Sequence, residues 1–227
     1  IHLVEEPFVV PGTFDEAFLE LPAEVVISVM RDHQRYFALR DAKGTLLPRY
    51  LNVVNTAEDP ERIATGNDRV LRARLADAAF FVREDRKQKL DARRPKLDTV
   101  VFQRKLGTVG EKVERIASLA AEFAPAFGLD PAVASRAAQL CKCDLESLIV
   151  FEFPELQGQM GRYYADLDGE APEVACAIEE HYRPAGASDD VAASKLGALL
   201  AVADRVDTLV GCFAIGQAPK GNADPFG

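Results

Sequence analysis

Residues 196–210 read LGALLAVADRVDTLV, and this stretch decides the fold class of the second half of the chain. Its apolar side chains recur at steps of three and four residues, as on one face of an α-helix. They are Leu196, Leu199, Leu200, Ala203, Val206 and Val210. The stretch predicts a long amphipathic helix, which we place over residues 190–213. Asp207 lies on the same stripe, so we expect its carboxylate to be hydrogen-bonded in the interior or at a domain contact.

The residues from about 106 onward show the same helical periodicity, interrupted by Gly and Pro. The predicted helices, besides the one at 190–213, cover residues 109–127, 131–150, 155–165 and 171–182. The second half is therefore predicted to be entirely helical.

The first half mixes strand and helix signals. Strands are predicted at 8–10, 36–39 and 50–54, with a hairpin turn at 41–44, and helices at 22–32 and 67–90. We expect Pro95 to break the chain. The fold class is therefore α+β: residues 1–95 form the end of an N-terminal α/β region, and residues 96–227 form a helical domain.

Composition and charge exclude some classes of protein. The 227 residues are 48% hydrophobic and 28% charged, and no apolar run is long enough to span a membrane. The net charge of −9 argues against a general nucleic-acid binder. Residues 62–105, however, hold 13 basic and 6 acidic side chains. The chain has no initiator Met, and we expect it to be a piece of a longer polypeptide.

The long helix in this basic segment separates its charges from its apolar side chains. At 100° per residue, Arg69, Arg72, Arg83 and Lys87 fall opposite an apolar set. That set consists of Val70, Leu71, Ala78, Phe81 and Val82. Arg74 falls among the apolar residues, so we expect it to form a structural ion pair. The other four charges have two open interpretations: a solvated helix face, or contacts with RNA phosphates or with an acidic protein partner.

The cysteines do not form a metal-binding pattern. Cys141, Cys143, Cys176 and Cys212 include no C-x-x-C pair. We expect buried, reduced thiols in a cytosolic protein.

Motifs of catalysis are absent from the sequence. Gly211 and Gly216 have the spacing that starts a P-loop, but Gln217 stands where Lys is required. The sequence also lacks G-x-G-x-x-G, G-x-S-x-G and H-E-x-x-H motifs. We therefore expect no catalytic residue.

A second candidate site combines Cys143-Asp144, in an apolar helical stretch, with Asp204 in the later helix. Phosphohydrolases of the HD superfamily hold divalent metal with an early His, a His-Asp pair and a distant Asp, and this chain resembles them in part. Cys143 replaces the His of the pair, and no upstream His is available. His181 shares a helix face with apolar residues and is predicted to be a buried structural His. The resemblance implies an HD-like fold without its chemistry, with no metal site; we expect Asp204 to be held by Arg205 or backbone donors.

Segments along nearly the whole chain resemble the beta subunit of bacterial glycyl-tRNA synthetase. They are MRDHQRYF (30–37), LLPRYLNVVN (46–55), GNDRVLRARLADAAFF (66–81), FQRKLG (102–107), CKCDL (141–145), QGQMGRYY (157–164), HYRP (181–184), ADRVDTL (203–209) and GQAPKGNADPF (216–226). No single segment is a catalytic motif, but their ordered set is specific to this family.

This resemblance implies a central fragment of the beta subunit: the end of its N-terminal α/β region, then a degenerate HD-like domain. In the family, a separate alpha subunit makes glycyl-adenylate from ATP and glycine with Mg²⁺, and the beta subunit binds tRNA. The implied partners are the alpha subunit and glycine tRNA, in the cytoplasm and away from membranes. No cofactor is expected in the fragment itself.

Two other functions stay open from the sequence. One is a metal-dependent HD-type phosphohydrolase domain, and the other is an interaction scaffold from a different assembly. A metal assay separates the first from a tRNA ligase segment, and tRNA binding by a longer chain separates the second.

Overall fold

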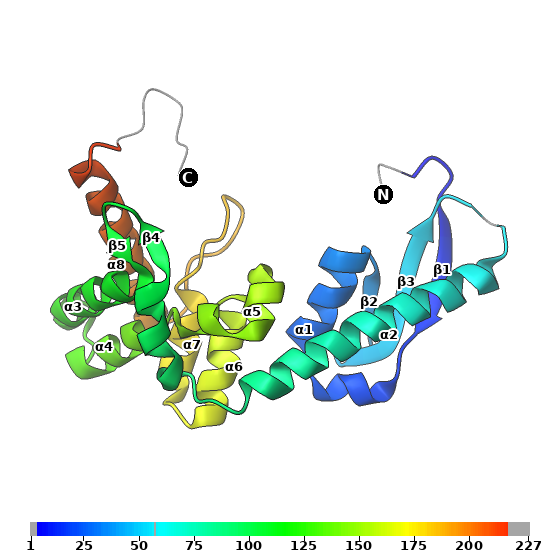
Figure 1. Cartoon of the computed structure of the whole chain (residues 1–227), viewed down its shortest axis with the longest axis horizontal. Coiled ribbons are helices and arrows are strands. Elements are labelled where there is room, and N and C mark those ends of the chain that lie inside the picture. Colours follow the sequence, from blue (N-terminus) through cyan, green and yellow to red (C-terminus); the bar gives the residue numbers. More distant parts are fainter. Residues whose placement is uncertain (1–3, 57, 218–227) are drawn as a thin grey trace. The chain divides into compact units, whose positions relative to one another are not determined.

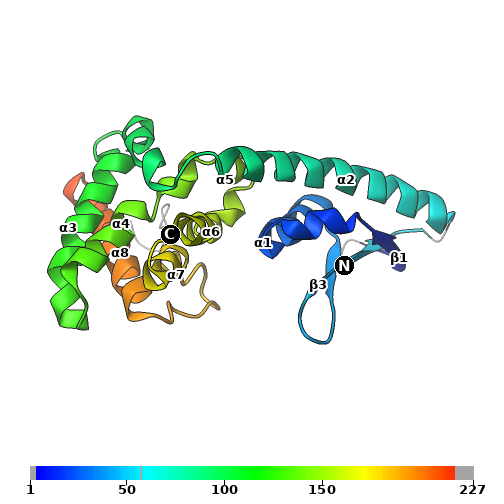
Figure 2. The same cartoon turned by 90° about the horizontal axis from the view of Figure 1, so that it is seen from below.

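A computed structural model describes residues 4–56 and 58–217 and divides into two compact units, whose elements are shown in Figures 1 and 2. The first unit runs to Lys87 and includes residues 152–156; the second begins at Gln88. A small sheet followed by helices confirms the predicted α+β class. The domain boundary between residues 95 and 96 stays a prediction. Most of the family-like segment at 216–226 lies outside the described residues.

An antiparallel sheet in the order β1–β3–β2 forms the first unit. Its strands are β1 (Phe8–Thr13), β2 (Phe37–Arg40) and β3 (Leu46–Val54). The predicted hairpin turn is confirmed: Asp41 Oδ1 accepts hydrogen bonds from the backbone of Lys43 and Thr45, at 2.9 and 2.8 Å. Val10 and Tyr50 face the interior, each 1% exposed.

Helices cover one face of this sheet. After the 3₁₀ turn η1 (Glu16–Glu20), α1 (Ala23–Ser28) leads into the π-helical turn η2 (Val29–His33), and the long α2 (Pro60–Asp85) packs against β1 and η2 (Figure 1). The helix α2 begins seven residues before the predicted start at residue 67. Asp59 caps it by accepting from the backbone N of Arg62 at 3.1 Å, and Pro60 suits the first helical turn.

Pro95 does not break the chain, so that prediction was wrong. It lies inside the 3₁₀ helix η3 (Asp91–Thr99). Because proline has no N–H, the carbonyl of Ala92 loses its usual i+3 donor. The side-chain amide of Gln88 donates to that carbonyl instead, at 3.1 Å, so the short helix continues.

The second unit contains a two-stranded ribbon, which was not predicted from the sequence. It joins β4 (Val101–Gln103) and β5 (Gly107–Thr108). Gln103 Oε1 accepts from the backbone N of Lys105 and Leu106, at 2.5 and 3.2 Å, and closes the turn. Gly107 takes a φ of 86°, which favours glycine.

Up to residue 217, where the described part ends, six α-helices follow, as the periodicity predicted in outline. They are α3 (Val109–Phe127), α4 (Pro131–Leu140), α5 (Leu148–Glu152), α6 (Gln159–Asp168), α7 (Pro172–Glu180) and α8 (Lys195–Ala214). The helix α3 packs against α4 and α8, and α7 packs against α6 and α8 (Figure 2). This arrangement brings the ends of α4 and α7 close to the middle of α8.

The single helix predicted at 131–150 is wrong. The chain leaves α4 after Leu140 and forms the 3₁₀ turn η4 (Cys143–Glu146) before α5 begins. Ser147 stabilises the break, because its hydroxyl donates to the carbonyl of Asp144 at 2.6 Å and accepts from the backbone N of Val150 at 3.3 Å. Cys143 and Asp144 therefore lie on a turn, and not inside a helix as expected.

Candidate functional site

Two lysines enclose Asp204 in the interior of the second unit. Lys112 comes from α3, Lys142 directly follows α4, and Asp204 lies on α8. Lys112 Nζ is 2.7 Å from Asp204 Oδ1, and Lys142 Nζ is 2.8 Å from Asp204 Oδ2. The lysine side chains are 6% and 8% exposed. Burial by itself raises the pKa of Asp204, but the two ammonium groups outweigh it and hold that pKa below its ordinary value.

The cluster extends one turn along α8 to Asp207. Lys112 Nζ is 3.2 Å from Asp207 Oδ2 and 2.7 Å from Thr208 Oγ1. Arg115 Nε donates to Asp207 Oδ1 at 2.5 Å. The Asp207 side chain is 5% exposed. The prediction that this carboxylate is hydrogen-bonded in the interior is confirmed.

His181 completes the cluster as a neutral acceptor. Its Nε2 is 2.8 Å from Lys142 Nζ, and its Nδ1 is 2.6 Å from the carbonyl O of Ile178. Since an ammonium only donates, Nε2 accepts and Nδ1 carries the proton. Burial, and then the charge of Lys142, hold the pKa of His181 well below its ordinary value. The prediction of a buried, hydrogen-bonded structural His is confirmed.

Arg205 does not hold Asp204, and that expectation was wrong. Its guanidinium donates to backbone carbonyls, including those of His181 at 3.2 Å and Pro184 at 3.1 Å. The side chain follows the surface of α8 toward the segment after α7. Lys112 and Lys142 occupy the interior position next to Asp204 instead.

Asp144 faces a different set of donors. Its Oδ2 accepts from the backbone N of Gly158 at 2.6 Å and of Gly161 at 3.1 Å, at the start of α6. Its Oδ1 is buried and accepts from none of the described residues. Burial raises the pKa of Asp144 to about 6, although the Gly158 N–H opposes this shift. The carboxylate therefore holds α6 against the η4 turn.

The four cysteines are free thiols, as expected. Cys141 and Cys143 are buried, and burial raises the pKa of both thiols. Cys176 and Cys212 are only partly buried, so the expectation of four buried thiols was wrong for these two. Cys143 Sγ lies 3.4 Å from the carbonyl O of Gln139. A protonated thiol in this position is a poor metal ligand.

A pocket of about 260 Å³ opens over the cluster, lined in part by Tyr182, Asp204 and Thr208. Both oxygens of Asp204 are already bound by ammonium groups, whereas the buried Tyr182 hydroxyl has no hydrogen-bond partner among the described residues. Within residues 4–56 and 58–217, no group of three His, Cys, Asp or Glu side chains is placed to bind a metal ion. A divalent ion would have to displace Lys112 and Lys142. The expectation of no metal site stays a prediction, and this arrangement gives no support to HD-type phosphohydrolysis.

Neither lysine is among the candidate residues predicted from the sequence. Lys112 lies four residues before Ile116, on the apolar face of α3, and a charge at such a position is a signal for a buried ion pair. Lys142 stands between two cysteines in an otherwise apolar run, which is a weaker signal of the same kind.

Arg69, Arg72 and Arg83 form an exposed basic face of α2, as predicted. Lys87 is also exposed, but it lies beyond the end of α2 at Asp85, because this helix is shorter than the predicted 67–90. Lys87 Nζ is 2.6 Å from Glu84 Oε2, so its charge is partly balanced, and the Arg83 guanidinium lies 5.6 Å from the centre of the Phe80 ring. Phe80 is 47% exposed. The Arg83 guanidinium is thus within cation–π distance of an exposed ring.

The opposite, buried face of α2 is formed by Leu71, Leu75, Ala78 and Val82. Val70 is 47% exposed, so its predicted place in the apolar set was wrong. Arg74 is 3.7 Å from Glu152, which confirms that it forms an ion pair.

The described residues thus define an α+β chain with an amphipathic basic helix and a helical unit whose central acid is neutralised by lysines. No helix within the described part of the chain combines the length and apolar character needed to span a bilayer. The family model described as "Glycyl-tRNA synthetase beta subunit" matches residues 1–227.

Similar proteins agree with this match. The chain is 54% identical over 225 residues to the glycine–tRNA ligase beta subunit of Chromohalobacter salexigens, and 53% identical over 229 residues to that of Geobacter sulfurreducens. Each match covers 99% of this chain and 33% of the relative. The chain belongs to the glycyl-tRNA synthetase beta subunit family, and it spans about a third of the length of these relatives.

Proposed function

We propose that this chain is part of the beta subunit of a cytoplasmic, heteromeric glycine–tRNA ligase, which joins glycine to its tRNA at the expense of ATP. The observation that carries the proposal is the match to beta subunits along the whole chain, at about half of all positions. The helical unit is the degenerate HD-like domain. ATP and Mg²⁺ are used at the alpha subunit, and this segment is non-catalytic. In support, Lys112 and Lys142 bind the Asp204 carboxylate that would otherwise be a metal ligand.

The basic face of α2 is the part of this segment that contacts the tRNA backbone. Its side chains are exposed, while Asp204 and Asp207 of the second unit are enclosed by cations of their own chain. Phosphate contacts weaken steeply as salt rises, and each contributes close to one unit to the log–log slope of affinity against salt.

The test is charge reversal, Arg72→Glu with Arg83→Glu, in the intact heteromeric enzyme. We expect weaker tRNA binding and a shallower salt slope, with subunit association unchanged. Arg40→Glu is the matched control, because Arg40 is an exposed arginine of the same unit that donates to the carbonyl of Gly44 at 2.6 Å. Unchanged tRNA affinity and salt slope would exclude the RNA role. Loss of subunit association instead would assign this face to the alpha subunit.

A further inference from the structure

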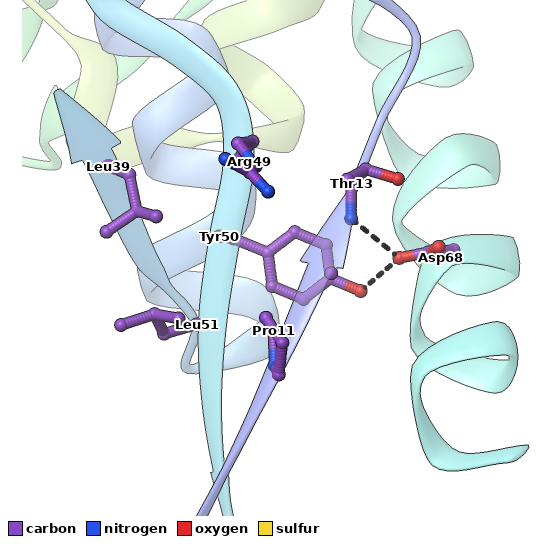
Figure 3. A pocket seen from close by; sticks show the side chains of 8 residues that line it. Pro11, Thr13, Leu39, Arg49, Tyr50, Leu51 and Asp68 are labelled. Atoms are coloured by element: carbon purple, nitrogen blue, oxygen red, sulfur yellow. Dashed lines mark hydrogen bonds between the residues drawn. The ribbon is translucent and has the colours of Figure 1, made fainter. Parts of the chain in front are cut away.

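A pocket of about 380 Å³ lies in the first unit and is lined by residues of β1, β2 and β3 and by Asp68 of α2 (Figure 3). Pro11, Leu39 and Leu51 form its apolar part, and Arg49 and Asp68 are its charged residues. A volume of this size accommodates one small ligand. The pocket shares no residue with the lysine-enclosed cluster of the second unit.

Asp68 is held firmly, but only through one of its oxygens. Its Oδ1 accepts from the hydroxyl of Tyr50 at 2.6 Å and from the backbone N of Thr13 at 3.1 Å (Figure 3). The Tyr50 ring is fixed in turn by stacking on Tyr36, with ring centres 4.5 Å apart. It also lies directly against Gly12, where a Cβ would be 2.1 Å from the ring. Within the described part of the chain, the second oxygen of Asp68 accepts no hydrogen bond.

Arg49 is the other charged group that the fold does not use. Its side chain is exposed on β3, and none of the described residues accepts a hydrogen bond from it. The Asp68 carboxylate, whose second oxygen has no donor among the described residues, and the Arg49 guanidinium therefore line the same pocket. This differs from the cluster around Asp204, where the protein's own groups occupy both oxygens.

We propose that this pocket receives one unpaired nucleotide of RNA. The base lies on the apolar part and donates an N–H to the second oxygen of Asp68, while its phosphate binds Arg49. Arg72 lies one helical turn after Asp68, so the pocket borders the basic face of α2. That continuity favours an RNA strand over a free amino acid. The inference rests on the proposed function, because the RNA is the tRNA of the ligase.

The experiment compares chemical probing of unpaired bases in glycine tRNA, free and bound at saturation to the intact enzyme. Asp68→Asn keeps an oxygen for Tyr50 and Thr13 but turns the second acceptor into a donor. Arg49→Gln removes the phosphate partner, and Arg40→Gln is the control. We expect at least one base protected by the wild type to regain reactivity in both pocket variants but not in the control. Affinity should fall about tenfold.

Unchanged protection in both pocket variants would overturn the inference. Loss of subunit association without a change in protection would also overturn it and would assign the pocket to a protein contact. The result of this probing experiment can be distinguished from the result of the charge-reversal experiment that tests the proposed function. If charge reversal at Arg72 and Arg83 leaves tRNA affinity unchanged, the basic face is excluded, but protection by the pocket is still read at saturation. Thermal unfolding of each variant checks that the fold is intact.

Discussion

Replacing Asp144 by Asn should change how the stability of this chain depends on pH. In the folded chain burial raises the pKa of this carboxyl from 3.8 to about 6. The folded state therefore holds a proton that the unfolded state releases. The stabilisation is fully present below pH 3.8 and is lost as the pH rises through about 6. Since one pKa unit corresponds to ~1.4 kcal/mol, the full loss is about 3 kcal/mol.

The assay is urea unfolding of the wild type and of Asp144→Asn at pH 4 and at pH 7.5. Asparagine can still accept from Gly158 and Gly161, but it does not titrate. The stability of the variant relative to the wild type should therefore rise by about 2 kcal/mol between these two pH values, because part of the titration lies below pH 4. Packing effects and all other titrating groups cancel in this difference.

A matched control is Glu122→Gln, which removes an exposed carboxylate from α3. It measures the effect of losing one negative charge on the same chain. If Asp144→Asn changes stability by the same amount at both pH values, the buried carboxyl does not carry the raised pKa, and the reasoning fails.

Three further predictions concern the interior of the second unit. Lys142→Met should destabilise the chain by about 2–4 kcal/mol in urea unfolding, because it leaves Asp204 and His181 without a shared donor; a cost below 1 kcal/mol would show that Lys112 alone suffices. Because the pKa of His181 is low in the folded chain, only the unfolded chain gains this proton below pH 6.5. The contribution of neutral His181 to the stability of the fold is therefore complete above pH 6.5 and decreases as the pH falls below that value. Between pH 7.5 and 5.5, His181→Gln should therefore lose about 1 kcal/mol less unfolding free energy than the wild type. The same pH profile for both proteins would contradict a neutral, buried His181. Gly161→Ala places a Cβ 2.6 Å from Ile178 and should lower the melting temperature. The control, Gly66→Ala on α2, meets nothing within 4 Å and should raise it. Equal effects of the two substitutions would refute the crowding at Gly161.

Local sequence signals were sufficient where one helix face decides the structure. The apolar stripe predicted α8 and also identified Asp207 as an interior carboxylate, because its position follows from helical geometry alone. The separation of charge on α2 similarly predicted an exposed basic face. In these cases a single element contains all the information that the prediction needs.

Tertiary contacts decided the features that the sequence did not predict. The amide of Gln88 compensates for Pro95, and the hydroxyl of Ser147 stabilises the break before α5. Asp204 meets lysines that lie 92 and 62 residues earlier in the chain. The nucleotide pocket joins side chains from separate strands and a helix. The periodicity of one helix or strand carries no information about tertiary contacts between separate elements.

Lys112 and Lys142 place two positive charges next to Asp204, and both charges belong to side chains of the protein itself. A bound divalent ion also brings two charges, but it dissociates, and its occupancy depends on concentration. A tethered ammonium is present in every copy of the protein at every metal concentration. It also has no vacant coordination position at which a water molecule could be activated. The pair thus joins α3, α8 and the segment after α4 without a bound ion.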